Sequence, residues 1–387
     1  MQANGRQMSL SGHDETNAPG TIAREQGELG NMHAADICRP DLDFEFEALK
    51  KVSRSFALTI PELPADLGRV VTNAYLICRI IDTIEDDEAL PLDVKARFFK
   101  EFVQVLNAEA PAVPFAENLT ARLSDGVPEA ERELVKNIPV IIGGNLSLTP
   151  PQRQVIRKCG TVMAQGMLEF QRLKKPGGLE DLEALNRYCY FVAGVVGEML
   201  TELFCDHAPA IAGRRQELLA LAASFGQGLQ MTNIIKDLWE DQRQGTCWLP
   251  RSVFAAVGCD LNRLTPGDGG EAFARGIAEM IGITRGHLNN ALSYTLLIPP
   301  EEVGIRRFCL WAIGMAVFTL RNINKNKLFC SGGEVKISRQ TLRSIIMVCN
   351  MTQRNDFLLA GLFAWITHDL PAARTNAAGS RGGPPLP

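Results

Sequence analysis

Two short acidic motifs contain the residues of this sequence whose types and spacing could carry chemistry. The first reads Asp-Thr-Ile-Glu-Asp-Asp from Asp82 to Asp87, and the second reads Asp-Leu-Trp-Glu-Asp from Asp237 to Asp241. Residues three and four apart on a helix share one face, so each motif would gather its carboxylates on one side of a helix. Carboxylates held so close together repel one another unless cations lie between them.

Polar residues extend both acidic faces towards the N-terminus. Tyr75 and Arg79 precede the first motif at helical spacing, and Gln230 and Asn233 precede the second. The other positions of both segments are mainly apolar, which is typical of a buried helix, although one such motif alone is usually a solvated face. A buried unpaired charge costs several kcal/mol or becomes protonated, so these carboxylates need a polar cavity. We therefore predict two buried helices that face each other across one cavity.

The chemistry predicted for this cavity is ionisation of a diphosphate ester. Hard oxygen ligands favour Mg²⁺, which commonly takes one or two protein carboxylates and completes its shell with water and phosphate oxygens. The metal would stabilise the departing diphosphate. A zinc site is not expected, because the ten cysteines include no CxxC pair and the five histidines are far apart.

The elements that must position these motifs are helices. Segments rich in Ala, Leu, Ile, Met, Glu and Arg alternate with Pro and Gly breakers, and alternating strand patterns are scarce. No Gly-rich loop follows a predicted strand, so a Rossmann or P-loop fold has no support. The expected fold class is all-α, in a single domain. The predicted helices are 69–87, 92–109, 129–145, 151–174, 179–206, 213–241, 271–298, 301–323 and 339–368.

Composition fits one large globular domain. The chain has 387 residues, of which 46% are hydrophobic and 22% charged, so a disordered chain is excluded. A net charge of −4 gives no whole-chain case for nucleic-acid binding. We expect an all-α domain over 39–370, between a disordered N-terminal arm (1–38) and a disordered C-terminal tail (371–387).

Targeting signals and long apolar runs are few. The first thirty residues are polar and do not resemble a signal peptide, and scattered cysteines suit a reduced compartment. Phe308–Leu320 and Phe357–Thr367, the most apolar runs, are shorter than the roughly 20 residues of a spanning helix. We expect buried core helices, a cytoplasmic location that leaves peripheral membrane contact open, and a monomer.

Three motifs, in this order, resemble the squalene/phytoene synthase family, the head-to-head trans-isoprenyl diphosphate synthases. The first combines Ser53-Arg-Ser-Phe-Ala with the segment from Tyr75 to Asp87. The second is Tyr188-Cys-Tyr-Phe-Val-Ala-Gly-Val-Val-Gly, and the third runs from Gln230 to Asp241. The resemblance extends from about residue 50 to about residue 350 and covers the predicted core.

The resemblance implies an isoprenoid synthase fold with a central hydrophobic cavity that binds two molecules of farnesyl diphosphate. Mg²⁺ would be held by Asp82, Glu85, Asp86, Asp237 and Asp241. The expected catalytic residues are Tyr188, which would handle the proton, and the four aspartates of this set. Ser53, Arg54, Arg79 and Lys236 would contact diphosphate oxygens, with Phe56, Tyr75, Gln230, Asn233 and Phe308 as further substrate-binding candidates. Lys336 and Arg339 would bind NADPH.

The reaction implied by the resemblance has two halves. Loss of one diphosphate gives an allylic cation, which the double bond of the second molecule attacks, and proton loss yields presqualene diphosphate. A second ionisation and rearrangement, quenched by hydride from NADPH, gives squalene. A carbocation needs a dry apolar pocket with aromatic faces, which the phenylalanines of this sequence could supply.

Alternatives differ in the second half. Phytoene and dehydrosqualene synthases share the acidic motifs and omit the hydride step, while non-catalytic assembly factors of the same fold have lost motif carboxylates that are intact here. The stretch Val335-Lys-Ile-Ser-Arg resembles a Lys-Ile-Arg-Lys stretch implicated in NADPH binding, with Ser338 for arginine and Arg339 for lysine. This departure leaves the cofactor open. The lack of a C-terminal spanning anchor resembles the bacterial members.

Overall fold

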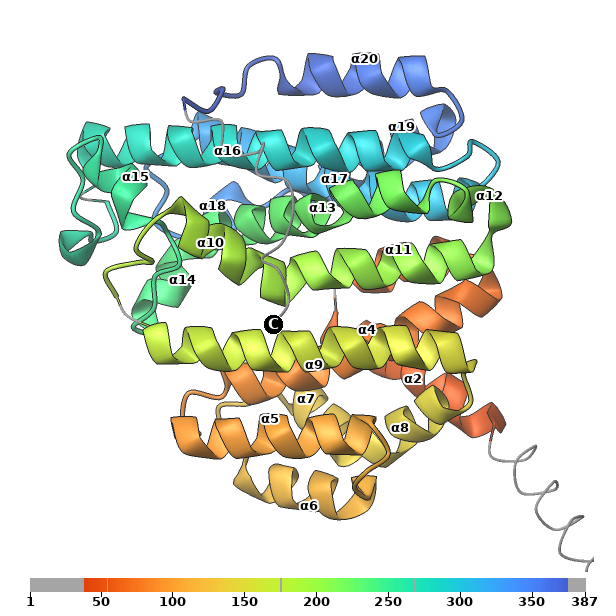
Figure 1. Cartoon of the computed structure of the whole chain (residues 1–387). Coiled ribbons are helices and arrows are strands. Elements are labelled where there is room, and N and C mark those ends of the chain that lie inside the picture. The colour runs from red at the N-terminus through yellow and green to blue at the C-terminus, as the bar shows by residue number, and fades with distance from the viewer. Residues whose placement is uncertain (1–37, 54, 175, 268, 375–387) are drawn as a thin grey trace, which may run out of the picture.

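The computed structural model describes residues 38–374 except 54, 175 and 268, and it is built almost entirely from helices (Figure 1). Within this part of the chain no strand forms, and one isolated β-bridge joins Leu179 to Pro250. The all-α fold class is confirmed. The boundaries given above for the arm and the tail stay predictions, because most of both segments lies outside the described residues.

Fourteen helices of eight or more residues make up the described part of the chain. They are α2 (Cys38–Val52), α4 (Ala65–Asp86), α5 (Leu92–Leu106), α6 (Ala112–Arg122), α7 (Glu129–Lys136), α8 (Ile138–Leu146), α9 (Pro150–Leu173), α10 (Leu182–Cys189), α11 (Val195–His207), α13 (Arg215–Lys236), α16 (Gly270–Leu297), α17 (Val303–Lys325), α19 (Arg339–Thr352) and α20 (Asp356–Thr367). Short helical turns connect them. These are α3 (Phe56–Thr59), η1 (Ile60–Glu62), π-helical η2 (Tyr190–Gly194), α12 (Pro209–Ala212), α14 (Leu238–Arg243), α15 (Arg251–Ala255), η3 (Leu261–Arg263) and α18 (Gly332–Val335).

Three predicted helices are each interrupted. The segment 129–145 forms α7 and α8, which meet at Asn137 because Pro139 is favoured in the first turn of a new helix. The segment 339–368 forms α19 and α20, and the side chain of Asn355 caps α20 by accepting a hydrogen bond from the backbone N–H of Leu358 (3.0 Å). The segment 213–241 is divided at Asp237. The helices α2 and α6 were not predicted.

The two acidic segments belong to different halves of the core. A first apolar cluster gathers around α4, α5, α9 and α11, and a second around α13, α16 and α17. Figure 1 shows α9 and α4 in the lower half of the molecule, α13 and α16 in the upper half, and α11 between them. Of the 22 residues of α4, 15 are buried, as its nearly continuous apolar sequence predicted.

Backbone-to-backbone packing fixes the two halves against each other. A Cβ atom on Gly226 of α13 would lie 2.1 Å from the carbonyl oxygen of Ala193 in η2, and one on Gly197 of α11 would lie 2.2 Å from that of Ala222. Only glycine permits such an approach. The π-helical turn lies directly after Tyr188, in the stretch predicted as one helix over 179–206. The close approach therefore sets where Tyr188 lies relative to the chain that leads into Asp237.

Two helical stretches are long and apolar enough to cross a membrane by length and composition alone. They are Leu182–His207 and Val303–Lys325, the second of which is 23 residues long and contains the shorter apolar run considered above. Their most apolar windows are 50% and 67% buried inside the fold. This burial is the behaviour of core helices, as expected for Phe308–Leu320. The same expectation was wrong for Phe357–Thr367, which forms α20, because this helix packs on the core with one side only and leaves Phe357 85% and Trp365 68% exposed.

The contact at Gly226 predicts a large effect of one methyl group. Gly226→Ala should lower the free energy of unfolding by about 2–3 kcal/mol, because the Cβ would overlap a backbone carbonyl that cannot rotate away. The matched control is Gly143→Ala in α8, where nothing lies within 4 Å and alanine should stabilise the helix slightly. Denaturant unfolding of both variants measures the difference. Equal stabilities would contradict the packing described here.

Candidate active site

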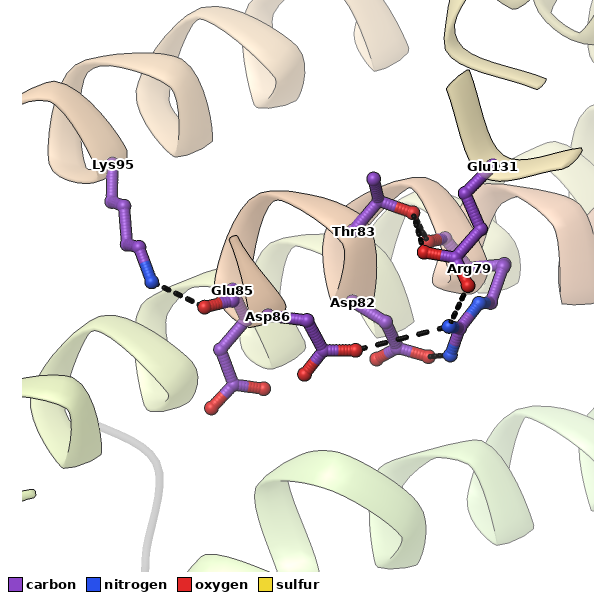
Figure 2. A network of polar contacts seen from close by, with 7 residues as sticks. All are labelled: Arg79, Asp82, Thr83, Glu85, Asp86, Lys95 and Glu131. Carbon is purple, nitrogen blue, oxygen red and sulfur yellow. Dashed lines mark hydrogen bonds and ion pairs between the residues drawn. The ribbon is translucent and has the colours of Figure 1, made fainter. Parts of the chain in front are cut away.

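The first acidic motif forms the last turns of α4, with its carboxylates and Arg79 on one face (Figure 2). The Arg79 guanidinium lies 3.5 Å from Asp82 and 3.8 Å from Asp86, and it donates a hydrogen bond to Glu131 of α7. Arg79 was predicted to contact the substrate. In this structure it is the counter-ion of the carboxylates around it.

Neighbouring helices hold the remaining carboxylate of this face. Glu85 accepts a hydrogen bond from the side-chain amide of Gln171 in α9 (3.0 Å), and Lys95 of α5 donates to the backbone carbonyl oxygen of Glu85. Asp87 has a separate role, since its carboxylate accepts from the backbone N–H (2.8 Å) and hydroxyl (2.7 Å) of Ser124. The acidic face is therefore Asp82, Glu85 and Asp86, as the sequence predicted.

The second acidic motif begins at a helix break. The helix α13 ends at Lys236, and α14 begins at Leu238, so Asp237 joins two helices; the sequence prediction of one helix was wrong here. Asp241 still lies one turn beyond Asp237, because its backbone N–H donates to the carbonyl oxygen of Asp237 (2.9 Å). Trp239 stands between Asp237 and Asp241 in the sequence, and its ring is buried. Its indole N–H donates a hydrogen bond to the carbonyl oxygen of Phe329, and this bond anchors α14.

Basic and polar side chains of α13 lie next to Asp237. The ammonium of Lys236 is 3.1 Å from the Asp237 carboxylate and also donates to the side chain of Asn233 (3.1 Å). Gln230, one turn earlier, is half-buried. These three predicted substrate-binding residues therefore share one side of α13 with the acidic motif that follows it.

The two acidic motifs are within electrostatic range of each other. Burial raises the pKa of Asp241 to about 7, and the charges of Asp237 and, from the other motif, Asp86 add to the rise. Burial also raises the pKa of Asp82 to about 7 and, with repulsion from Asp86, that of Glu85 to about 8. The pKa values of Asp86 and Asp237 are raised as well, chiefly by burial. The carboxylates of the two motifs are thus close enough for their charges to interact.

Tyr188 lies within electrostatic range of carboxylates from both motifs. It is buried, its ring stacks on Trp248 at 3.9 Å between centroids, and the ring of Phe170 packs against it at 5.2 Å. Burial raises its pKa well above the ordinary value, and the negative charges of Glu85 and Asp241 raise it further. The phenol is therefore a neutral group placed beside carboxylates from both sides of the site.

An aromatic region continues along α4 from the acidic face. Tyr75 lies one turn before Arg79; burial raises the pKa of its phenol, and a hydrogen bond with Ser53 opposes that rise. The rings of Phe56 and Tyr75 are 5.2 Å apart, and both pack against the apolar cluster that contains Phe308. The structure thus brings together the predicted substrate residues Ser53, Phe56 and Tyr75, and Phe308 belongs to the same apolar cluster. Arg54, predicted with them, lies outside the described residues.

Both predicted cofactor residues are exposed, and Lys336 lies within electrostatic range of the second motif. Lys336 is exposed just after α18, and its charge opposes the burial-driven rise in the pKa of Asp237. Arg339 is exposed at the start of α19. Ser338 caps α19 by accepting a hydrogen bond from the backbone N–H of Thr341 (3.0 Å). A helix start therefore explains the serine that stands where the family stretch has arginine.

The donor set fits Mg²⁺ that is shared with a diphosphate. Among the described residues no three His, Cys, Asp or Glu side chains are close enough to enclose one ion. Mg²⁺ does not need such a cage, since it takes one or two carboxylates and fills its shell with water and phosphate oxygens. Carboxylates whose pKa values are raised by burial, and further by mutual repulsion, are groups that a dication would stabilise in their charged form.

Sequence reasoning did not find several residues of the site. They come from other helices and loops, where no helical spacing relates them to the motifs: Lys95, Glu131, Gln171, Lys174 and Trp248. Lys174 pairs with Glu88 at 3.1 Å, and its charge opposes the rise in the pKa values of Asp86 and Asp241. Only the fold shows that these side chains surround the carboxylates.

The raised pKa values predict that the metal-free protein becomes less stable as the pH rises. Asp82 has a pKa of about 7 in the folded chain and an ordinary value of 3.8, so between these values the folded state binds more protons. Stability is then lost as the pH rises through the folded pKa. In EDTA, Asp82→Asn should raise the free energy of unfolding by about 1–2 kcal/mol at pH 8 and by much less at pH 5.

Glu117→Gln, at an exposed position of α6, is the matched control and should leave the pH dependence unchanged. Urea unfolding across pH 5 to 9 in EDTA gives the comparison. An Asp82→Asn variant that is less stable than the parent at pH 8 would contradict the electrostatic description of the site.

Known proteins match most of this chain. The family described as squalene/phytoene synthase matches residues 49–341. A squalene synthase of Gibberella zeae is 30% identical over 328 residues, which cover 81% of this chain and 67% of the relative. A squalene synthase of Schizosaccharomyces pombe is 31% identical over 287 residues, covering 73% of this chain and 59% of the relative.

Solved structures share the fold. The complex of TcSQS with a ligand has a TM-score of 0.68 at 24% identity, covering 87% of this chain and 94% of that one. A dehydrosqualene synthase in complex with a ligand has a TM-score of 0.56 at 19% identity, covering 83% and 98%. With the family match over the segment that carries both acidic motifs and Tyr188, these likenesses identify the chain as a member of the squalene/phytoene synthase family.

Proposed function

We propose that this protein condenses two molecules of farnesyl diphosphate head to head into presqualene diphosphate and then reduces that intermediate with NADPH to squalene. The observation that carries the proposal is that carboxylates of the two motifs lie within electrostatic range of each other and of Tyr188, whose ring belongs to an aromatic region. Relatives that carry the name squalene synthase support it. Each overall turnover forms squalene, NADP⁺ and two diphosphates, and releases the proton lost in the first half.

The chain's own residues would hold the diphosphate groups. Lys236 and Lys174 lie beside the carboxylates of the two motifs, and the hydroxyl of Ser53 lies near Tyr75 at the other end of the acidic face. Mg²⁺, when bound by Asp82, Glu85 and Asp86 on one side and Asp237 and Asp241 on the other, would neutralise the departing diphosphate. Arg79 is already paired with three carboxylates and would keep the α4 face in place.

Tyr188 is suited to relaying a proton from one group to another. Its raised pKa keeps the phenol neutral near pH 7, so it can accept a proton from carbon only while its own proton passes on. The carboxylates around it and a bound diphosphate oxygen are the available acceptors. Its stacking on Trp248 and the ring of Phe170 hold the phenol in one orientation.

Apolar walls would protect the cationic intermediates. Phe170, Tyr188 and Phe191 pack together, and Phe308 packs edge-on against Phe204 with ring centroids 6.1 Å apart. Aromatic faces stabilise nearby positive charge, and a dry pocket prevents water from trapping the cation. The aromatic side chains of the described core therefore support the proposed condensation.

The reductive half of the proposed reaction has less structural support than the condensation. Lys336 is exposed within electrostatic range of Asp237, and Arg339 is exposed at the start of α19. Both could bind the phosphates of NADPH, whereas Ser338 caps the helix. This stretch has one cation fewer than the family stretch that it resembles. The difference favours a second candidate, a synthase that stops before reduction and releases dehydrosqualene or presqualene diphosphate. The two candidates share the same metal and diphosphate site.

The purified chain incubated with farnesyl diphosphate and Mg²⁺ should release squalene only when NADPH is present. Asp82→Asn and Asp237→Asn should each lower kcat by about 10²–10³, the usual cost of removing a group that stabilises developing charge. Mass spectrometry identifies the products, and Glu117→Gln should match the parent. A product that is the same with and without NADPH would leave only the first half, and near-normal activity of either variant would contradict the two-motif site.

Removing the Tyr188 hydroxyl should slow the first half-reaction. Tyr188→Phe keeps the stacking on Trp248, so the expected loss of about 10²-fold in formation of presqualene diphosphate would reflect lost proton transfer. Single-turnover assays started from farnesyl diphosphate or from presqualene diphosphate separate the two halves. If only the second half slows, the role assigned to Tyr188 is wrong.

A further inference from the structure

One face of the molecule exposes large apolar side chains in an unusual concentration. Of the eleven large hydrophobic residues exposed in the described part of the chain, five lie on α19 and α20. These five, Met347, Met351, Phe357, Leu358 and Trp365, are called the α19–α20 face here. Phe357 is 85% exposed, Met351 78% and Trp365 68%. Such side chains protrude into solvent and do not line a groove.

The helix α20 is apolar on both of its sides. Leu359 is buried, and Phe363 and Ile366 pack inwards against the core, while Phe357 and Trp365 face outwards. Figure 1 shows α20 along the outer edge of the molecule, above α16 and α19. A surface helix normally has a polar outer side, so the outer side of α20 indicates an environment other than water.

Positive charge borders the α19–α20 face. Arg343 and Arg354 are exposed beside Met347 and Met351 in the sequence, Arg339 begins α19, and within the described residues none of the three forms an ion pair. The nearby carboxylates are already paired. Asp356 binds the fully buried Arg306, and Asp369 lies 3.4 Å from Arg321. The border of the face therefore keeps an uncompensated positive charge.

We propose that the α19–α20 face docks on the surface of an anionic lipid bilayer. Phe357, Leu358 and the methionines would enter the acyl boundary, Trp365 would lie at the level of the headgroups, and the arginines would contact lipid phosphates. A second copy of the chain is a poorer partner, because a two-fold contact through this face would bring the arginines of both copies together. The proposal goes beyond the catalytic function and does not depend on it.

The chain contains its own reporter for this interaction. It has four tryptophans; Trp239, Trp248 and Trp311 are buried, and Trp365 is the exposed one. Adding vesicles of mixed phosphatidylglycerol and phosphatidylcholine to the full chain should shift tryptophan emission to shorter wavelength, with co-sedimentation as a parallel measure. Trp365→Phe should lose the shift and still sediment with the vesicles.

Variants distinguish the parts of the docking surface. Phe357→Glu should abolish sedimentation, whereas Val113→Glu, a 53% exposed position on α6 far from α20, should not change it. Arg343→Gln with Arg354→Gln should weaken binding by about 25-fold, at roughly fivefold per arginine, and salt should weaken binding of the parent chain. Arg263→Gln, which is also exposed, is the charge control.

Two results would overturn the proposal. One is a parent chain that does not bind these vesicles at low salt. The other is a chain that is dimeric by light scattering and becomes monomeric with Phe357→Glu while its vesicle binding is unchanged, which would assign the face to a second copy. Neither result bears on product formation, so the catalytic proposal is tested separately.

Discussion

Repulsion among buried carboxylates is the constraint on which the rest of this structure depends. Five acidic side chains from two helical segments share one site, and burial raises the pKa of each. A protein would not keep such a group for stability alone, because apolar residues in the same places would cost less. The surrounding cations, such as Arg79 and Lys236, reduce the repulsion without removing it. The arrangement is one that a dication bound together with a diphosphate would stabilise.

The packing of the helices holds the two groups of carboxylates in place despite their repulsion. The last turns of α4 carry one group of carboxylates, and the junction of α13 and α14 carries the other. Glycine contacts between α13 and the π-helical turn draw two backbones together, and Tyr188 emerges where that turn begins. A rigid contact of this kind is needed because a phenol must stay within proton-transfer distance of its acceptors.

Most of the first acidic site could be predicted, and the second only in part. Asp82, Glu85 and Asp86 lie on one face because α4 is regular through its last turn. Asp237 interrupts its helix, which helical periodicity could not indicate, although a backbone hydrogen bond keeps Asp241 near it. The resemblance to a known family brought Tyr188 into consideration, since a single tyrosine in an apolar segment is usually part of the core.

The sequence by itself determined the fold class, the apolar helices and the residues that share a face, because helical periodicity is a local property of the chain. The tertiary structure decided which distant side chains meet. Glu131 pairs with Arg79, Trp248 stacks on Tyr188, and both contacts join elements far apart in the sequence. Such contacts depend on how helices rotate and approach one another, which is set by the volumes and shapes of side chains across the whole core.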